Sequence, residues 1–217
     1  NNRKEAREMT FNSWEFLIFY PITLLLYFLL PKKWSRISLL FMSAIFYLAW
    51  NYKLIVLIMF TTAVSYFCAR IIEKTEKKAV KKLCIVITLI ACLGVLFFFK
   101  YYNFLAETLG WAIKAAGGGT YDFTLNLVLP VGISFYTFQT LSYAIDVYRG
   151  TEKVEKDFAL YCLFVTFFPQ LVAGPIERPG NLIPQLREKN KLTADNARAG
   201  LWKMGVGFFK KIVVADL

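Results

Sequence analysis

Long runs of residues without any charged side chain alternate along this chain with short charged segments. A membrane-spanning helix needs about 20 apolar residues, with about 17 as the lower limit. Several runs lie near that limit. Their helices can still span the membrane if flanking Trp, Tyr and Lys side chains extend to the interface. The pattern therefore predicts an all-α, polytopic helical membrane protein. The runs cover residues 16–31, 37–52, 54–69, 83–99, 123–145 and 158–176.

The composition agrees with a lipid environment. Hydrophobic residues make up 57% of the chain and charged residues only 19%, whereas an average soluble domain is about half apolar and a quarter charged. We treat residues 1–8 as a polar N-terminal extension and residues 9–217 as one transmembrane domain. Residues 16–30 are expected to stay in the membrane, because no small-residue cleavage site follows them.

The basic residues predict the orientation of the helices. Segment 70–82 is rich in Lys and Arg, whereas Lys100 and Lys114 are the only basic residues of segment 100–122. Cytoplasmic loops carry the excess of basic residues, so the first segment is predicted to be cytoplasmic and the second external. The same rule places segments 32–36 and 149–156 in the cytoplasm. The net charge of +11 thus indicates topology, and no nucleic-acid partner is expected.

The sequence FFPQLVAGPIERPG, residues 167–180, breaks the last long apolar run. If run 158–176 crossed the membrane, the basic segment 177–203 would be external, against the charge rule. Pro169, Gly174-Pro175 and Pro179 interrupt helical hydrogen bonding. We therefore predict a re-entrant segment that dips into the membrane and returns to the cytoplasmic side. Such broken backbone is tolerated at membrane depth only where it is buried in protein or lines a wet cavity.

A polar stripe follows one face of the helix expected within 131–150. Gln139, Ser142, Tyr143 and Asp146 are spaced i, i+3, i+4 and i+7, so they share a face. Two interpretations remain open. The stripe faces a cavity in the bundle, or its members are interhelical hydrogen-bond partners, with Asp146 paired to Arg149.

Several kinds of chemistry have no support in the sequence. The chain has no histidine, so neither a Ser-His or Cys-His couple nor the usual zinc site is expected. No phosphate-binding Gly-Lys-Ser/Thr loop is present. The four cysteines lie in apolar runs without ligand spacing, as buried thiols do; they are Cys68, Cys84, Cys92 and Cys162.

A final helix is predicted after Thr193, a suitable N-cap residue. Apolar residues then recur at spacings of three or four from Ala197 to Ile212. Lys203, Lys210 and Lys211 lie on other faces. Both an interfacial amphipathic helix and a packed helix with snorkelling lysines fit this pattern.

Four segments together resemble the membrane-bound O-acyltransferase (MBOAT) family, in particular the alginate O-acetylation branch. They are MTFNSWEFLIFYPI (9–22), LPVGISFYTFQTLSYAIDVYRG (129–150), FFPQLVAGPIERPGNLIPQL (167–186) and GFFKKIVVADL (207–217). They occur in family order along the chain. The resemblance implies a multi-pass bundle in the cytoplasmic membrane, of which this chain is about the N-terminal half.

The activity implied by the resemblance is acyl transfer, usually of acetyl. The donor is a cytoplasmic thioester, acetyl-CoA or an acyl carrier, and no cofactor is bound. The acceptor is a hydroxyl of an exopolysaccharide or another cell-envelope polymer, and an extracytoplasmic acetyltransferase is an expected partner protein. The family histidine follows the last matching segment, so this chain alone is expected to be inactive.

The same resemblance suggests substrate-binding roles for six residues, none of them catalytic. Gln170, Glu177 and Arg178 would shape the cytoplasmic entrance, and Arg178 would attract an anionic donor. The polar stripe would line the tunnel wall through Gln139, Tyr143 and Asp146. Two other functions remain open, a transporter or flippase and a non-catalytic membrane scaffold. A transporter is expected to contain a repeated pair of broken helices, and the sequence shows one break.

Overall fold

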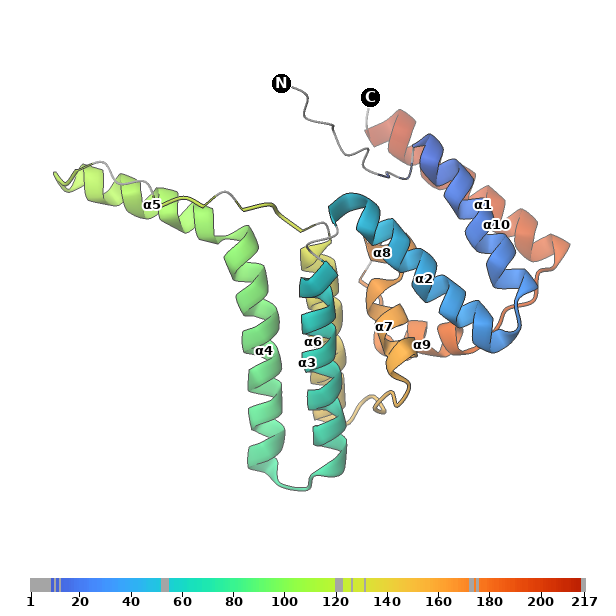
Figure 1. Ribbon diagram of the computed structural model, residues 1–217, viewed down its shortest axis with the longest axis horizontal. Coiled ribbons are helices and arrows are strands. Elements are labelled where there is room, and N and C mark those ends of the chain that lie inside the picture. Colours follow the sequence, from blue (N-terminus) through green and yellow to red (C-terminus); the bar gives the residue numbers. More distant parts are fainter. Residues whose placement is uncertain are drawn as a thin grey trace.

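The computed structural model describes residues 9, 11, 13–51, 55–119, 123–125, 127–130, 132–171, 174 and 176–215. The polar extension 1–8 and Pro175 lie outside this part of the chain. The described elements are all helical, which confirms the all-α prediction (Figure 1). They are α1 (Trp14–Leu29), α2 (Lys32–Asn51), α3 (Ile55–Lys74), α4 (Lys78–Lys100), α5 (Tyr102–Ala115), α6 (Ile133–Arg149), α7 (Phe158–Thr166), α8 (Phe168–Leu171), α9 (Pro179–Arg187), α10 (Ala194–Phe209) and the π-helix η2 (Lys210–Ala215).

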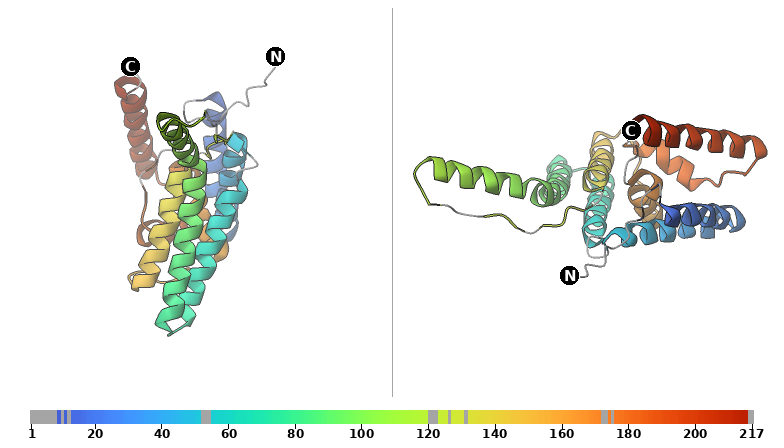
Figure 2. Two further views of the ribbon diagram at one scale, coloured as in Figure 1. Left: turned by 90° about the vertical axis from the view of Figure 1, so that its left-hand side faces the viewer. Right: turned by 90° about the horizontal axis from the view of Figure 1, so that it is seen from above.

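Helices α3 and α4 are long and apolar enough to cross a membrane. Helix α1 and the α7–α8 pair are shorter apolar helices. Helices α3, α4 and α6 each pack against the other two and form a three-helix bundle (Figures 1 and 2). Helices α1, α2 and α7 form a second group next to it, with α2 packed on both α1 and α7. The helix lengths and apolar surfaces fit a membrane protein.

The predicted run 123–145 is helical only from Ile133 onward. Residues 123–125 and 127–130 have no regular secondary structure. Gly132, the N-cap of α6, has a φ of +71°, a left-handed conformation that side chains with a Cβ disfavour. A Cβ at Gly132 would lie only 2.3 Å from the Leu171 carbonyl oxygen. Glycine is therefore required where the start of α6 touches the end of α8.

The sequence predicted helix α10 but not helix α5. Helix α5 falls in a stretch that we treated only as an external loop, and it runs across the direction of α4 (Figure 1). Helix α10 begins at Ala194 as predicted, because the Thr193 hydroxyl accepts a hydrogen bond from the Asn196 N–H at 3.2 Å. Helix α10 has no buried residue in this structure.

Candidate functional site

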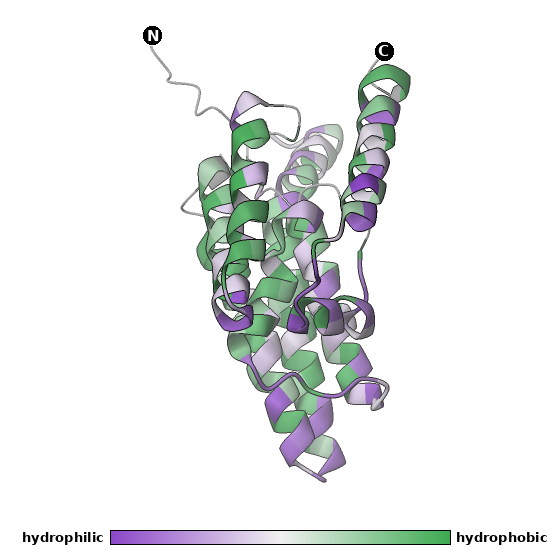
Figure 3. Ribbon diagram, turned by 90° about the vertical axis from the view of Figure 1, so that its right-hand side faces the viewer, coloured by the Kyte–Doolittle hydropathy of each residue, from purple (hydrophilic) through white to green (hydrophobic). Residues whose placement is uncertain are grey.

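The basic segments gather at one end of the helices. Arg36, near the start of α2, contacts Asp157 in the linker before α7 at 3.4 Å. Glu73, near the end of α3, pairs with Lys156 of the same linker at 3.9 Å. The ribbon coloured by hydropathy shows hydrophilic residues concentrated at this end (Figure 3). We call it the basic end.

The segment after α9 reaches the basic end as well. Its Lys189 ammonium donates to the carbonyl oxygens of Phe28 and Leu30, at 2.9 and 2.7 Å, where α1 ends. The segments that the charge rule placed together in the cytoplasm therefore lie together in the fold. Their position on the cytoplasmic side stays a prediction.

The chain from α7 to α9 leaves the basic end and returns to it. Glu155 precedes α7, and its buried carboxylate forms an ion pair with Arg187, the last residue of α9. Helix α7 has 9 residues and rises about 14 Å, less than half of a hydrocarbon core about 30 Å thick. A spanning helix would have separated Glu155 from Arg187 by the whole core. The chain therefore doubles back between Glu155 and Arg187, as a re-entrant path requires. Its depth in the membrane stays a prediction.

The bend of this re-entrant segment is anchored by neighbouring helices. The Phe168 N–H donates to the Ser43 hydroxyl of α2 at 3.3 Å. The Phe168 ring packs against Phe19 and Phe46, with centroid distances of 5.2 and 5.5 Å. Beyond α8, a Cβ at Gly174 would lie 2.7 Å from the Gln170 Cα, so glycine allows the chain to turn back tightly.

The polar stripe of α6 connects α6 to the re-entrant segment. Gln139 is buried, and its side-chain amide donates to the Phe164 carbonyl of α7 at 2.8 Å. Tyr143 is also buried, and its hydroxyl accepts from the Glu155 N–H at 2.9 Å. These contacts match the hydrogen-bonding interpretation of the stripe. A substrate-binding role for either side chain stays a prediction.

Asp146 has a different position at the end of the stripe. Its carbonyl oxygen accepts from the N–H groups of Thr151 and Glu152, at 3.0 and 3.3 Å, and so holds the turn after α6. Within the described residues, no ion pair joins its half-buried carboxylate to Arg149. The pairing considered from the sequence does not form.

The three predicted entrance residues lie at the two ends of the re-entrant turn. Gln170 is buried in α8, and its carbonyl accepts from the Gly174 N–H at 3.0 Å. Glu177 accepts a hydrogen bond from the Asn181 amide at 2.7 Å. Arg178 is exposed and is the N-cap residue of α9. Their local contacts shape the turn, and their contact with a substrate stays a prediction.

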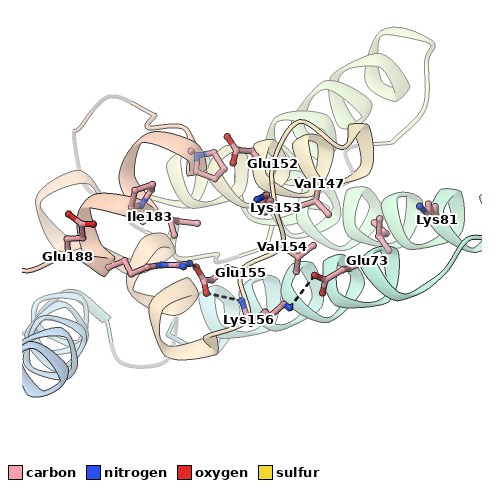
Figure 4. A pocket seen from close by; sticks show the side chains of 15 residues that line it. Glu73, Lys81, Val147, Glu152, Lys153, Val154, Glu155, Lys156, Ile183 and Glu188 are labelled. Carbon is pink, nitrogen blue, oxygen red and sulfur yellow. Dashed lines mark hydrogen bonds and ion pairs between the residues drawn. The ribbon is translucent and has the colours of Figure 1, made fainter.

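A cavity of about 780 Å³ lies at the basic end between α9, the linker 152–156 and the ends of α3 and α4 (Figure 4). Its walls carry charges of both signs. Two of its carboxylates are paired, Glu155 with Arg187 and Glu73 with Lys156. We call it the charged cavity. Its other charged lining residues are Lys81, Glu152, Lys153 and Glu188.

A second cavity of about 230 Å³ lies on the opposite face of α9, between α9, α1 and the bend. Its lining from α1 runs from Tyr27 to Tyr20, a distance of about 10 Å along the helix. At the basic end the Asn190 N–H donates to the Tyr27 hydroxyl at 3.2 Å, and at the deep end lie Phe168 and Pro169. We call it the apolar groove. It connects the basic end with the bend.

Helix α9 is the wall between the two cavities. Ile183 and Arg187 line the charged cavity, whereas Leu182 and Leu186 line the apolar groove. None of the six predicted substrate-binding residues lines either cavity. The alternation of apolar residues in 179–187 at helical spacing could have indicated a two-sided helix. The position of its two faces depends on packing against α1 and α7, which the sequence pattern does not reveal.

The structure thus defines a helical membrane protein with a re-entrant segment bordered by two cavities. No family model and no solved structure matches the chain. The chain is 34% identical to the peptidoglycan O-acetyltransferase of Helicobacter pylori, over 91% of this chain and 42% of that protein. It is also 34% identical to the probable alginate O-acetylases AlgI of Pseudomonas aeruginosa and Azotobacter vinelandii, over 96% of this chain and 40% and 42% of those proteins.

These similarities confirm the resemblance to the alginate O-acetylation branch. The chain is homologous along almost its whole length to proteins named as alginate and peptidoglycan O-acetylating enzymes. It spans about two fifths of the length of these relatives.

Proposed function

We propose that this chain is part of a membrane O-acyltransferase that moves an acetyl group from a thioester donor to hydroxyl groups of a cell-envelope polysaccharide or peptidoglycan. The observation that carries the proposal is the similarity over 91–96% of the chain to proteins with these names. The membrane concerned is the cytoplasmic membrane, crossed several times, with the basic end inside.

The fold supports a route for the donor from the basic end. The apolar groove begins beside Asn190 and Tyr27 and ends at the bend of the re-entrant segment. The pantetheine arm of such a donor is a narrow chain with two amides and a hydroxyl. The groove offers apolar walls with polar groups from Tyr20, Thr23, Tyr27, Gln185 and Asn190. The donor is acetyl-CoA or an acyl carrier, and an extracytoplasmic acetyltransferase acts on the other side as partner.

The reaction needs a base, and this chain lacks histidine, the residue that most often acts as one. The acceptor oxygen attacks the thioester carbonyl, a base takes the hydroxyl proton, and the thiolate leaves. Hydrogen-bond donors must also stabilise the developing oxyanion. Since the 217 residues include no histidine, we expect the base in another part of the complete protein. The role of the present residues is to bind and orient the donor.

The proposal is tested by expressing the complete gene in a host that lacks envelope O-acetylation. Base-labile acetate on purified polysaccharide and peptidoglycan is then measured. We expect ester-linked acetate on at least one polymer, and the empty vector as control should give none. Normal membrane insertion of the protein without acetate on any envelope polymer would contradict the proposal.

A transporter is less well supported by the structure. Such folds place their site between a repeated pair of broken helices. The described residues contain one helix pair interrupted in this way, α8 and α9. The relatives that match are named as acetylating enzymes.

A further inference from the structure

Helix α5 has two different faces. At 100° per residue, Asn103, Glu107 and Lys114 share one narrow polar face. Large apolar side chains cover the broad opposite arc and are exposed, with 65% of Phe104 and 72% of Trp111 accessible and Leu105 and Leu109 about half accessible.

The hydroxyl near the middle of the apolar arc has a partner within the helix. The Thr108 hydroxyl donates to the Phe104 carbonyl at 2.7 Å. A hydroxyl satisfied in this way can enter an apolar environment without losing a hydrogen bond to water. The arc is therefore suited to contact with hydrocarbon.

The polar face of α5 is held by the chain that returns to α6. The Asn103 side chain donates to the Leu125 carbonyl at 2.8 Å and accepts from the Leu125 N–H at 2.9 Å. These two bonds place the returning segment alongside the polar face. The apolar arc is left open on the other side.

The open arc continues an apolar surface of α4. Helix α4 is a candidate membrane span that is little buried in the protein, and many of its apolar side chains are exposed. They extend along the helix as Leu83, Val86, Ile87, Ile90, Leu93 and Phe97. At the corner between α4 and α5, the Lys100 ammonium lies 5.6 Å from the centre of the Tyr101 ring. Aromatic residues and lysines of this kind mark the membrane interface.

We propose that α5 lies flat in the interface of the leaflet at the end opposite the basic end, with phospholipid as its partner. Phe104, Leu105, Leu109 and Trp111 contact acyl chains, and Glu107 and Lys114 face water. The arrangement is that of an interfacial amphipathic helix. The direction of α5 across α4 agrees with it (Figure 2). The inference is independent of the proposed acetyl transfer.

The test compares two neighbouring positions on α5. The complete protein is reconstituted into phosphatidylcholine–phosphatidylglycerol vesicles as Leu109→Cys or as Glu107→Cys, and each variant carries a nitroxide on the new thiol. All four natural cysteines are buried, so the unchanged protein is the labelling control. We expect the ratio of oxygen to nickel-chelate accessibility to be several-fold higher at position 109 than at position 107, because oxygen concentrates in acyl chains.

Two outcomes would overturn the proposal. Equal nickel accessibility at both positions would place α5 in water. Exclusion of both reagents from position 109 would mean that protein, either a second copy or another chain, covers the arc. Trp111 gives a check without new cysteines. Vesicles with brominated acyl chains should quench the fluorescence of the protein more than that of Trp111→Phe, and equal quenching would contradict the proposal.

Discussion

Buried threonines inside the α3–α4–α6 bundle and polar side chains that face the re-entrant segment form hydrogen bonds with different partners. In α3, the Thr61 and Thr62 hydroxyls bond to carbonyls of their own helix, such as Ile58. Around the re-entrant segment, Gln139 bonds to the backbone of another element, the Phe164 carbonyl of α7. Small residues with internally satisfied hydroxyls let helices approach closely.

The difference in hydrogen-bond partners arises because the backbone groups of a continuous helix are paired within it, whereas those of a broken segment are not. A continuous helix satisfies its own N–H and C=O groups, so its side chains are free for close packing. A broken segment leaves backbone groups without helical partners, and these groups need side chains from other elements. Ser43 and Tyr143 meet this need at Phe168 and Glu155. The re-entrant path therefore depends on residues far away in the sequence.

The largest effect is expected where the two regions touch, at Gly132. Gly132→Val combines a positive φ with a Cβ placed against the Leu171 carbonyl, which should cost about 2–5 kcal/mol of unfolding free energy. Denaturation in mixed micelles measures this cost. Gly150→Val is the control, because its φ is +75° with no atom within 4 Å. Equal losses at the two positions would show that the contact with α8 has no effect.

The next effect concerns the buried Glu155, which receives the N–H groups of Lys156 and Asp157 besides Arg187. Glu155→Ala leaves these donors unpaired and should cost about 2–4 kcal/mol. Arg187→Ala removes one charged hydrogen bond but leaves the buried carboxylate its two N–H donors, so it should cost less, about 1.5–3 kcal/mol. Proteolysis of segment 155–187 in detergent should rise in the same order. An equal or reversed order would contradict the importance of the carboxylate.

A smaller loss of unfolding free energy is expected at Gln139. It tests whether a hydrogen bond to another element stabilises the fold more than one within a single helix. Gln139→Leu removes a hydrogen bond to another element and leaves the Phe164 carbonyl unpaired, at a cost of about 1–2 kcal/mol. Thr88→Val removes only a bond to the Cys84 carbonyl of its own helix and should cost about 0.5 kcal/mol or less. Both are measured by denaturation in the same micelles. A larger loss for Thr88→Val would invalidate the distinction between the two regions.

The last prediction concerns the apolar groove, where a change of activity is expected with little change of stability. Leu182→Phe places a larger side chain in the space of about 230 Å³ and should change the unfolding free energy by less than about 1.5 kcal/mol. Polymer acetylation by the complete protein should fall several-fold. Leu93→Phe on the exposed face of α4 is the matched control. Unchanged acetylation in Leu182→Phe would exclude the groove as the donor route.

Local signals predicted the features that depend on a few neighbouring residues. The prolines and glycines of 167–180 indicated the break, Thr193 indicated a helix start, and the basic segments indicated which loops lie together. The helix expected within 131–150 is observed as α6, whereas the uncharged run 123–145 begins ten residues before it. Pro130 and Gly132 were visible as helix-breaking residues, and they carry the physical reason for the shorter helix.

The cavities and α5 could not be obtained from the same signals. The two sides of α9 acquire their roles only through packing against α1 and the linker, which are distant in the sequence. Helix α5 was not predicted because segment 100–122 was used only to orient the neighbouring helices. Its apolar periodicity was not considered. Leu105, Leu109 and Ile113 recur at a helical spacing in that stretch.

The position of α9 has a mechanical consequence. Helix α9 alone separates the charged cavity from the apolar groove. A tilt of α9 that widens one of these cavities must therefore narrow the other. Helix α9 has only nine residues, so it would move as one short unit about the turns on either side. A molecule bound in the charged cavity would then narrow the apolar groove without entering it.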